Sequence, residues 1–253
     1  MCRHFAYAGR PVTLREAIID PAHGLYRQSW APRCQRHGTV NADGFGVGWY
    51  AGSDPVPARY RRFVPIWDDP SFADVARVCA SGAILAAVRD ATAGTAMDEA
   101  AVAPFAAGSW LFSHNGAVDG WPGSPAVTRL AATLSPESLL SLEARVDSAL
   151  LWALVLRRLR GGMAPGDALA TVTAELSSAG VNGRFNFLLT DGTTIAATAA
   201  GDSLWYQAAD GSVRVASEPC DDDPGWVQVP DGTLLTATAG GVSVTNLERI
   251  TIP

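Results

Sequence analysis

The residues best suited to chemistry stand at the start of the chain, which reads Met1-Cys2-Arg3-His4. A starting methionine is readily removed when the next side chain is as small as cysteine, so we expect a mature chain that begins at Cys2. An α-amine titrates at about pH 7.7–8.0 and a thiol at about pH 8.5. The amine of Cys2 can therefore take the proton of its own thiol and activate it as a nucleophile. Taken alone, a cysteine at position 2 is weak evidence for this chemistry.

A second candidate stretch is His114-Asn115-Gly116, which follows the apolar residues 110–112. A strand that ends in Asn-Gly most often marks only a turn. The same dipeptide also presents an amide side chain beside an unobstructed backbone N–H, as an oxyanion hole requires.

The composition bounds the class of protein. The chain has 253 residues, 48% of them hydrophobic and 17% charged, so a large buried core is expected. The net charge of −6 argues against a nucleic-acid partner. Every basic side chain is arginine, which excludes lysine chemistry. No apolar run is long enough to cross a membrane, and four scattered histidines offer no metal cluster. The cysteines are typical of reduced cytoplasmic thiols: Cys2, Cys34, Cys79 and Cys220. We expect a cytoplasmic protein without cofactor or metal.

The secondary-structure elements expected to position these residues form one domain over 1–253. A strand over 3–8 precedes a helix that starts at a Thr13–Glu16 capping box, and residues 21–42 form an irregular loop. The alternating glycines of 44–48 suit a strand that needs close backbone approach on one face. Further predicted elements are strands 59–63, 83–88 and 110–116, a helix capped at Ser71, a helical zone over 126–176, and strands from Arg184 onward with Asp-Gly turns at 191–192, 210–211 and 231–232.

Five stretches, in this order, resemble the class II glutamine amidotransferase family of N-terminal nucleophile hydrolases. They are Cys2, Asn41-Ala42-Asp43-Gly44, Arg89-Asp90-Ala91-Thr92, His114-Asn115-Gly116 and Asp147-Ser148. The resemblance implies an α+β fold, a four-layer αββα sandwich in which two stacked antiparallel sheets are flanked by helices.

The resemblance also implies roles. Cys2 is the nucleophile with its own amine as base, and the Asn115 amide and Gly116 N–H hold the oxyanion. Arg89 binds the α-carboxylate of a glutamyl group through a planar two-pronged contact, and Asp147 binds its α-ammonium group. Thr92, His114 and Ser148 are further expected substrate contacts. One departure concerns the donor: the family often reads Arg-Trp-Ala-Thr-His where this chain has an aspartate and an alanine, at 90 and 93.

Nearly the whole chain, and residues 217–226 above all, is similar to the amidohydrolases of ergothioneine biosynthesis in actinobacteria. These enzymes remove glutamate from γ-glutamyl-hercynylcysteine S-oxide, which implies a small-molecule γ-glutamyl substrate and a thioester on Cys2. Their leaving group carries a trimethylammonium group, and Trp226 could offer it an aromatic face beside Asp221–Asp223. The tryptophan could equally cover one end of the sandwich. The chain ends without a synthetase domain, which favours a hydrolase that acts alone.

Other interpretations stay open from the sequence. A glutaminase that passes ammonia to a separate synthetase would share every catalytic residue. A binding module could keep the fold without the chemistry, although intact Cys2, Arg89, Asn115 and Asp147 argue against it. A papain-like use of Cys34 with His114 is a third alternative. The pattern is compatible with a homodimer.

Overall fold

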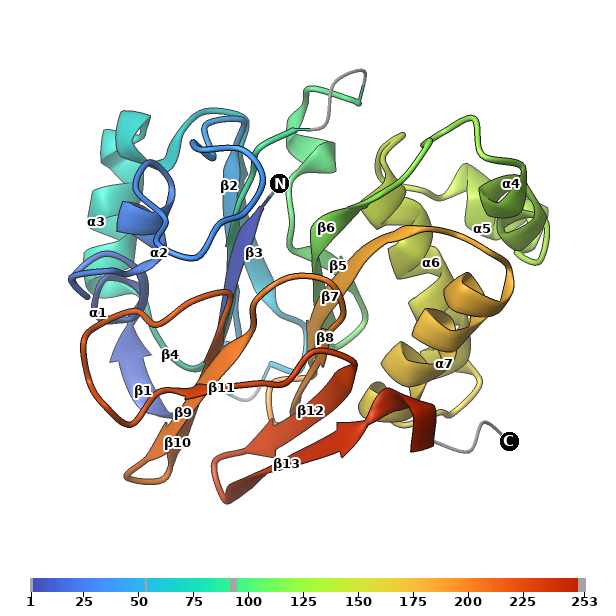
Figure 1. Ribbon diagram of the computed structural model, residues 1–253. Coiled ribbons are helices and arrows are strands. Elements are labelled where there is room, and N and C mark those ends of the chain that lie inside the picture. Colours follow the sequence, from blue (N-terminus) through green and yellow to red (C-terminus); the bar gives the residue numbers. More distant parts are fainter. Residues whose placement is uncertain (1, 53, 92–94, 250–253) are drawn as a thin grey trace.

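Two antiparallel sheets stack face to face between two layers of helices (Figure 1). The computed structural model describes residues 2–52, 54–91 and 95–249. In Figure 1 the layers follow one another from left to right, and β1 begins at the upper end of the seven-stranded sheet. The predicted α+β class and its four-layer αββα arrangement are confirmed.

The seven-stranded sheet has β1, the strand that follows Cys2, at its centre. Its strand order is β11-β9-β10-β1-β4-β2-β3. The helices α1 (Leu14–Ile18), α2 (Leu25–Gln28) and α3 (Pro70–Val78) belong to its outer face. The strands are β1 (Arg3–Thr13), β2 (Phe45–Trp49), β3 (Ala58–Arg62), β4 (Ala80–Val88), β9 (Trp205–Ala209), β10 (Ser212–Ala216) and β11 (Val227–Gln228).

The six-stranded sheet has the order β13-β12-β8-β7-β6-β5. Its outer face is covered by α4 (Pro125–Ala131), α5 (Pro136–Leu140), α6 (Asp147–Arg160) and α7 (Pro165–Ser178). The strands are β5 (Phe105–Ala107), β6 (Trp110–Val118), β7 (Gly183–Thr190), β8 (Ile195–Ala199), β12 (Thr233–Thr238) and β13 (Gly241–Asn246). Short 3₁₀ turns lie at η1 (Ile66–Asp68), η2 (Glu99–Ala101) and η3 (Leu247–Arg249).

Strand alternation decides which side chains meet between the sheets. Successive side chains of a strand point to opposite faces. On β1, Phe5 and Tyr7 pack in the cluster beneath α1–α3, whereas Ala6 and Ala8 pack in the cluster between the sheets. The alternating glycines serve the same interface, because a side chain on Gly46 would overlap the Ala103 carbonyl. The prediction of close backbone approach at 44–48 is confirmed.

Several local predictions are confirmed and two are wrong. The Thr13–Glu16 capping box is present, and Asp210 and Gly211 take positive φ angles of 51° and 69° in the two-residue turn between β9 and β10. The helix predicted to be capped at Ser71 begins earlier, because the Asp69 carboxylate accepts the N–H of Phe72. The strand predicted to end at Gly116 continues to Val118, since β7 pairs with it beyond the Asn-Gly dipeptide.

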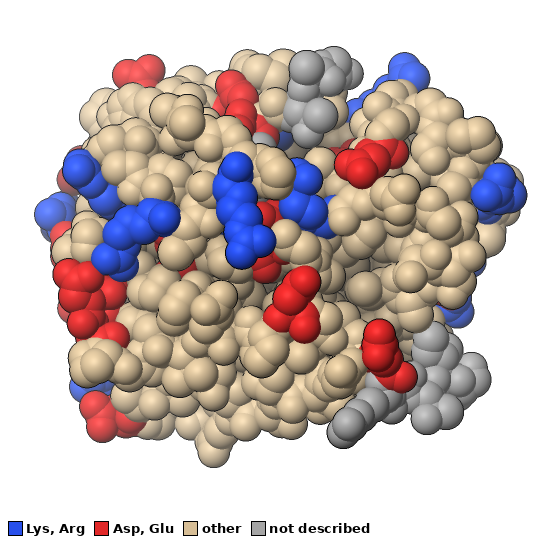
Figure 2. Space-filling model, in the orientation of Figure 1, with Lys and Arg blue, Asp and Glu red and all other residues tan. Residues whose placement is uncertain are grey.

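The surface carries both signs of charge. Figure 2 shows arginine and acidic side chains interspersed over the face it presents, without an extended patch of one sign. Among the described residues, no helix combines the length and the apolar character that a membrane span needs.

Candidate active site

Cys2 stands at the head of the central strand, half-buried. Arg3 pairs with Val88 of β4, so the register brings Cys2 beside Arg89, one residue beyond. By strand alternation Cys2 shares the inner face with His4, while Arg3 shares the outer face with Phe5. The thiol is therefore directed toward the six-stranded sheet.

Arg89 is a buried cation that forms no ion pair with a carboxylate among the described residues. Its side chain is 8% exposed, and its Nη2 donates to the Thr95 hydroxyl at 3.1 Å and to the Ala96 carbonyl at 2.9 Å. Its Nη1 is buried and has no hydrogen-bond partner in the described part of the chain, where no acidic side chain forms an ion pair with this guanidinium. A buried charge is costly unless it is paired. The site therefore suits an anionic group that arrives with a ligand.

Asn115 reaches the nucleophile's strand from the opposite sheet. It is fully buried on β6, and its Nδ2 lies 3.4 Å from the Ser217 hydroxyl oxygen, which also accepts the backbone N–H of His4 at 3.0 Å. The Ser217 hydroxyl thus links the amide to the backbone of His4, two residues from Cys2. Its Oδ1 is buried and has no partner among the described residues.

Gly116 follows on the same strand at a position that excludes any other residue. A Cβ there would overlap the carbonyl oxygen of Arg184 on β7. The close pairing of β6 with β7 thus keeps the backbone beside Asn115 bare, as the predicted oxyanion site requires.

Asp147 and Ser148 join β6 to the first turn of α6. The Asp147 carboxylate is 8% exposed and accepts the backbone N–H of Val118 at 3.0 Å and that of Ser148 at 2.8 Å. His114 Nε2 lies 2.8 Å from the Arg184 carbonyl, and its Nδ1 lies 3.0 Å from the Ser148 hydroxyl. Because a carbonyl only accepts, Nε2 carries a proton and Nδ1 of the neutral ring accepts from the serine.

The two histidines near the site are neutral. Burial, reinforced by the neighbouring Arg3 guanidinium and by His114, lowers the pKa of His4 to about 3. Burial also lowers the pKa of His114 below its ordinary value. The His4 ring is therefore a poor general base near neutral pH, and both ring nitrogens of His114 already face the Arg184 carbonyl and the Ser148 hydroxyl. The α-amine of Cys2 therefore stays the stronger candidate for deprotonating the thiol.

Residues 24–210 match the family model described as glutamine amidotransferases class-II. This chain belongs to that family. Its geometry is that of a class-II amidotransferase domain: the candidate nucleophile heads a central strand of one sheet, and the candidate oxyanion amide comes from the other.

Relatives of this chain match nearly its whole length. The gamma-glutamyl-hercynylcysteine sulfoxide hydrolase of Mycolicibacterium smegmatis is 42% identical over 247 residues, which cover 98% of this chain and 100% of that protein. The protein of the same name from Mycobacterium tuberculosis is 41% identical over 249 residues, 98% of each chain. The solved structure of a glutamine aminotransferase class-II domain protein from Silicibacter pomeroyi superposes with a TM-score of 0.70 at 26% identity, over 97% of this chain and 99% of that one.

Trp226 lies apart from the other predicted site residues. It is 8% exposed, packs in the cluster on the outer face of the seven-stranded sheet, and donates its indole N–H to Asp221 at 2.8 Å. It lines a cavity of about 430 Å³ together with Cys34 and the 221–224 turn. Two of the acidic side chains there form ion pairs, Asp221 with Arg214 and Asp222 with Arg33, and the Asp223 carboxylate accepts the Gly225 N–H. Trp226 as a reader of the trimethylammonium group stays a prediction, and Thr92 lies outside the described residues.

Glu218 is a residue to which the sequence assigned no role. Its side chain is fully buried and accepts the backbone N–H groups of Arg33 at 2.8 Å and Cys34 at 2.7 Å. Its carboxylate also lies 4.0 Å from the Arg3 guanidinium. One carboxylate thus fixes the 33–34 loop to the strand that starts at Cys2.

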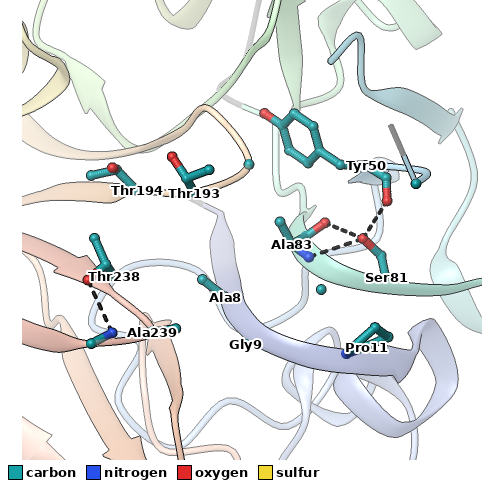
Figure 3. Close-up of a pocket in the computed structure, with 14 residues that line it drawn as sticks. Ala8, Gly9, Pro11, Tyr50, Ser81, Ala83, Thr193, Thr194, Thr238 and Ala239 are labelled. Carbon is teal, nitrogen blue, oxygen red and sulfur yellow. Dashed lines mark hydrogen bonds between the residues drawn. The ribbon is translucent and has the colours of Figure 1, made fainter. Parts of the chain in front are cut away.

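A larger cavity, of about 570 Å³, opens further along β1 and is lined by Ala8 and Gly9 (Figure 3). Hydroxyl, methyl and backbone groups form its wall, and among the described residues that line it Tyr50 is the only ionisable one. The Tyr50 hydroxyl is directed at the Ser109 and Thr190 carbonyls, and burial raises its pKa. The described residues that line this cavity contribute no thiol, amine or imidazole to its wall.

Proposed function

We propose that this protein hydrolyses the γ-glutamyl amide of γ-glutamyl-hercynylcysteine S-oxide and releases glutamate and hercynylcysteine S-oxide, a step of ergothioneine biosynthesis. The observation that carries the proposal is the 42% identity to a gamma-glutamyl-hercynylcysteine sulfoxide hydrolase over 98% of this chain and 100% of that protein. The arrangement of Cys2, Arg89 and Asn115 supports the chemistry.

The glutamyl end of the substrate suits the charges at the site. The α-carboxylate would accept hydrogen bonds from Arg89, whose Nη1 is buried without a partner in the described chain. The α-ammonium group would face Asp147, whose carboxylate is held by two backbone N–H groups. These contacts would direct the γ-carbonyl toward Cys2. His114 and Ser148 would act indirectly on the substrate, because their contact fixes the start of α6, where Asp147 lies.

The reaction would proceed in two balanced steps. The Cys2 sulfur bonds to the γ-carbonyl carbon as its own amine takes the thiol proton, and the Asn115 amide and Gly116 N–H stabilise the oxyanion. The carbon–nitrogen bond then breaks, and the departing amine receives that proton. Water attacks the thioester, the carbon–sulfur bond breaks, and glutamate leaves with the thiol restored. No cofactor is required.

A side-by-side assay tests the proposal. The purified protein is given γ-glutamyl-hercynylcysteine S-oxide and glutamine separately, and glutamate release is measured. We expect the higher kcat/KM for the sulfoxide. A higher kcat/KM for glutamine would favour the alternative, a glutaminase that supplies ammonia to a separate synthetase.

We also propose that the enzyme works in the cytoplasm on a small-molecule substrate, with neither nucleic acid nor membrane as partner and as a monomer or homodimer. The free thiols of Cys2, Cys34, Cys79 and Cys220 support a reducing compartment.

A further inference from the structure

A chain of buried polar side chains crosses from one sheet to the other next to the candidate nucleophile. The interface elsewhere is built from residues such as Ala6, Leu85 and Leu188. At the Cys2 end it contains instead Asn115, Asn186, Ser203 and Ser217, which are between 0% and 9% exposed. Buried polar groups of this kind are retained only where each is satisfied or serves a function.

The chain starts at Asn186, the neighbour of Asn115 across the β6–β7 pair. Asn186 Nδ2 donates to the Asp202 carbonyl at 2.9 Å, and its Oδ1 accepts the N–H groups of Ala200 and Asp202. The 200–203 turn is thereby fixed. The Ser203 hydroxyl then donates to the backbone carbonyl of Ser217 at 2.8 Å.

Ser217 closes the chain at the amide of Asn115. The Ser217 hydroxyl oxygen accepts the His4 N–H at 3.0 Å, and the backbone N–H of Ser217 donates to the His4 carbonyl at 3.0 Å. The remaining lone pair of the oxygen faces Asn115 Nδ2 at 3.4 Å. Since Asn115 Oδ1 has no partner in the described chain, Ser217 is the one described residue that hydrogen-bonds this side chain.

An amide side chain has one catalytically useful orientation here. Nδ2 can donate to an oxyanion, whereas Oδ1 in the same place would repel it. We propose that Ser217 is a positioning residue for the reaction: its hydroxyl accepts one Nδ2 hydrogen of Asn115 and so leaves the other available to the oxyanion. This inference rests on the proposed function, in which Asn115 stabilises the oxyanion.

The test compares Ser217→Ala and Ser217→Cys with Ser203→Ala. Alanine and cysteine both remove a good acceptor, while cysteine nearly keeps the volume. Ser203→Ala is the matched control, because it removes a buried hydrogen bond to Ser217 without touching the Asn115 amide. Loss of an oxyanion donor costs about 100- to 1,000-fold in kcat, so misplacing it should cost about 10- to 100-fold. We expect that loss in kcat for both Ser217 variants, with KM within about twofold of wild type and a smaller loss for Ser203→Ala.

A double-mutant cycle separates positioning from general stability. If Ser217 acts through Asn115, adding Ser217→Ala to Asn115→Ala should change kcat little further. An equal loss in both backgrounds would overturn the inference, as would wild-type kcat in a folded Ser217→Cys protein with a lowered Tm. If Ser217→Ala does not fold, the double-mutant cycle is measured with Ser217→Cys in its place.

The cycle can be repeated without the proposed substrate. A diazoketone analogue of glutamine alkylates a nucleophilic cysteine and has no hercynyl leaving group, so its labelling rate at Cys2, mapped by mass spectrometry, reports on the glutamyl side alone. Both Ser217 variants should be labelled more slowly than wild type, and the Ser217 substitutions should no longer slow labelling when Asn115 is already alanine. This result supports the inference even if the sulfoxide is not cleaved. Inactivity of the wild type on the sulfoxide, by contrast, would overturn only the proposed function.

Discussion

Cys2 and Arg89 meet because two antiparallel strands end together. β1 begins where β4 ends, and the Arg3–Val88 pair fixes the register that places Cys2 opposite Arg89. Burial lowers the pKa of His4 to about 3, which makes it a poor base, and both ring nitrogens of His114 are already directed at the Arg184 carbonyl and the Ser148 hydroxyl. At this scale the proposed chemistry depends on the α-amine of Cys2, the residue expected to begin the mature chain.

The first prediction concerns the free amine of Cys2. Intact mass should show loss of Met1, and Cys2→Ala should abolish turnover. Cys2→Ser should retain little activity, because a hydroxyl is far harder to deprotonate than a thiol. Cys34→Ser is the matched thiol control and should leave the kinetics of Cys2 labelling near wild type. Full activity in a protein that keeps an uncleaved residue before Cys2 would contradict the mechanism.

The second prediction concerns the charges that bind the glutamyl end. Losing one partner of a desolvated charged contact typically costs about 2–5 kcal/mol. Arg89→Lys and Asp147→Asn should therefore lower kcat/KM strongly, the lysine because it lacks the planar two-pronged contact. Arg160→Lys, at an exposed position on α6, is the control. Near-native kcat/KM in both site variants would show that the residues are misassigned.

At the scale of elements, the sequence predicts strands and turns well where local chemistry decides them. The capping box at Thr13 and the Asp210-Gly211 turn satisfy their own backbone groups, so no distant residue is needed to recognise them. The end of β6 was predicted wrongly, because pairing with Arg184 and Gly183 decides it and those residues lie far along the chain.

The candidate site divides in the same way. The family resemblance supplied Cys2, Arg89 and Asn115, whose residue types are required by the chemistry. Ser217 and Glu218 were visible in the sequence only as part of a similar stretch. Their roles depend on partners about 100 or 185 residues distant, Asn115 and Arg33, and no local pattern could reveal those contacts.

The third prediction tests the close approach of β2 to the other sheet. A methyl group on Gly46 would overlap the Ala103 carbonyl, whereas one on Gly241 in β13 meets nothing within 4 Å. Overpacking of this kind typically costs about 1–3 kcal/mol. Gly46→Ala should lower the free energy of unfolding by that amount, measured by denaturant titration, and Gly241→Ala should lower it much less. Equal losses would mean that the segment around Ala103 makes room for the methyl group without extra cost.

The fourth prediction concerns the 221–226 turn. A quaternary ammonium group held over an aromatic face gains roughly 0.5–2 kcal/mol. If Trp226 provides that face, Trp226→Ala should lower kcat/KM for the hercynyl substrate more than for an analogue with an unmethylated amine. Trp67, 40% exposed on η1, is the control tryptophan. An equal loss for both substrates would show that Trp226 only packs against the outer cluster.

At the scale of the whole molecule, titratable groups are buried at the catalytic end of the core. His4 is fully buried on the inner face of β1, and neither ring nitrogen has a hydrogen-bond partner among the described residues. Folding therefore requires the ring to be neutral. The stability of the sandwich is thereby coupled to pH through a residue two positions from the nucleophile.

The fifth prediction follows from the sign of that coupling. The pKa of His4 falls from 6.5 in the unfolded chain to about 3 in the folded protein, mainly through burial. Below the unfolded value the unfolded chain binds a proton that the folded chain does not, so stability is lost as pH falls through 6.5. The loss approaches about 1.4 kcal/mol per pH unit for one such histidine. Buried His114 adds to it in the same direction.

Denaturant titrations between about pH 6.5 and 5.5 would measure this loss, because Asp and Glu with ordinary pKa values of about 4 stay largely ionised there. The free energy of unfolding should fall across that window in the wild type. His4→Phe keeps a ring of similar size without a titrating nitrogen. Its free energy of unfolding should change less steeply with pH, by an amount that corresponds to the uptake of up to one proton fewer on unfolding. His37→Gln, at an exposed loop position, should keep the wild-type slope. An unchanged slope in His4→Phe would mean that the His4 ring is not held neutral by the fold.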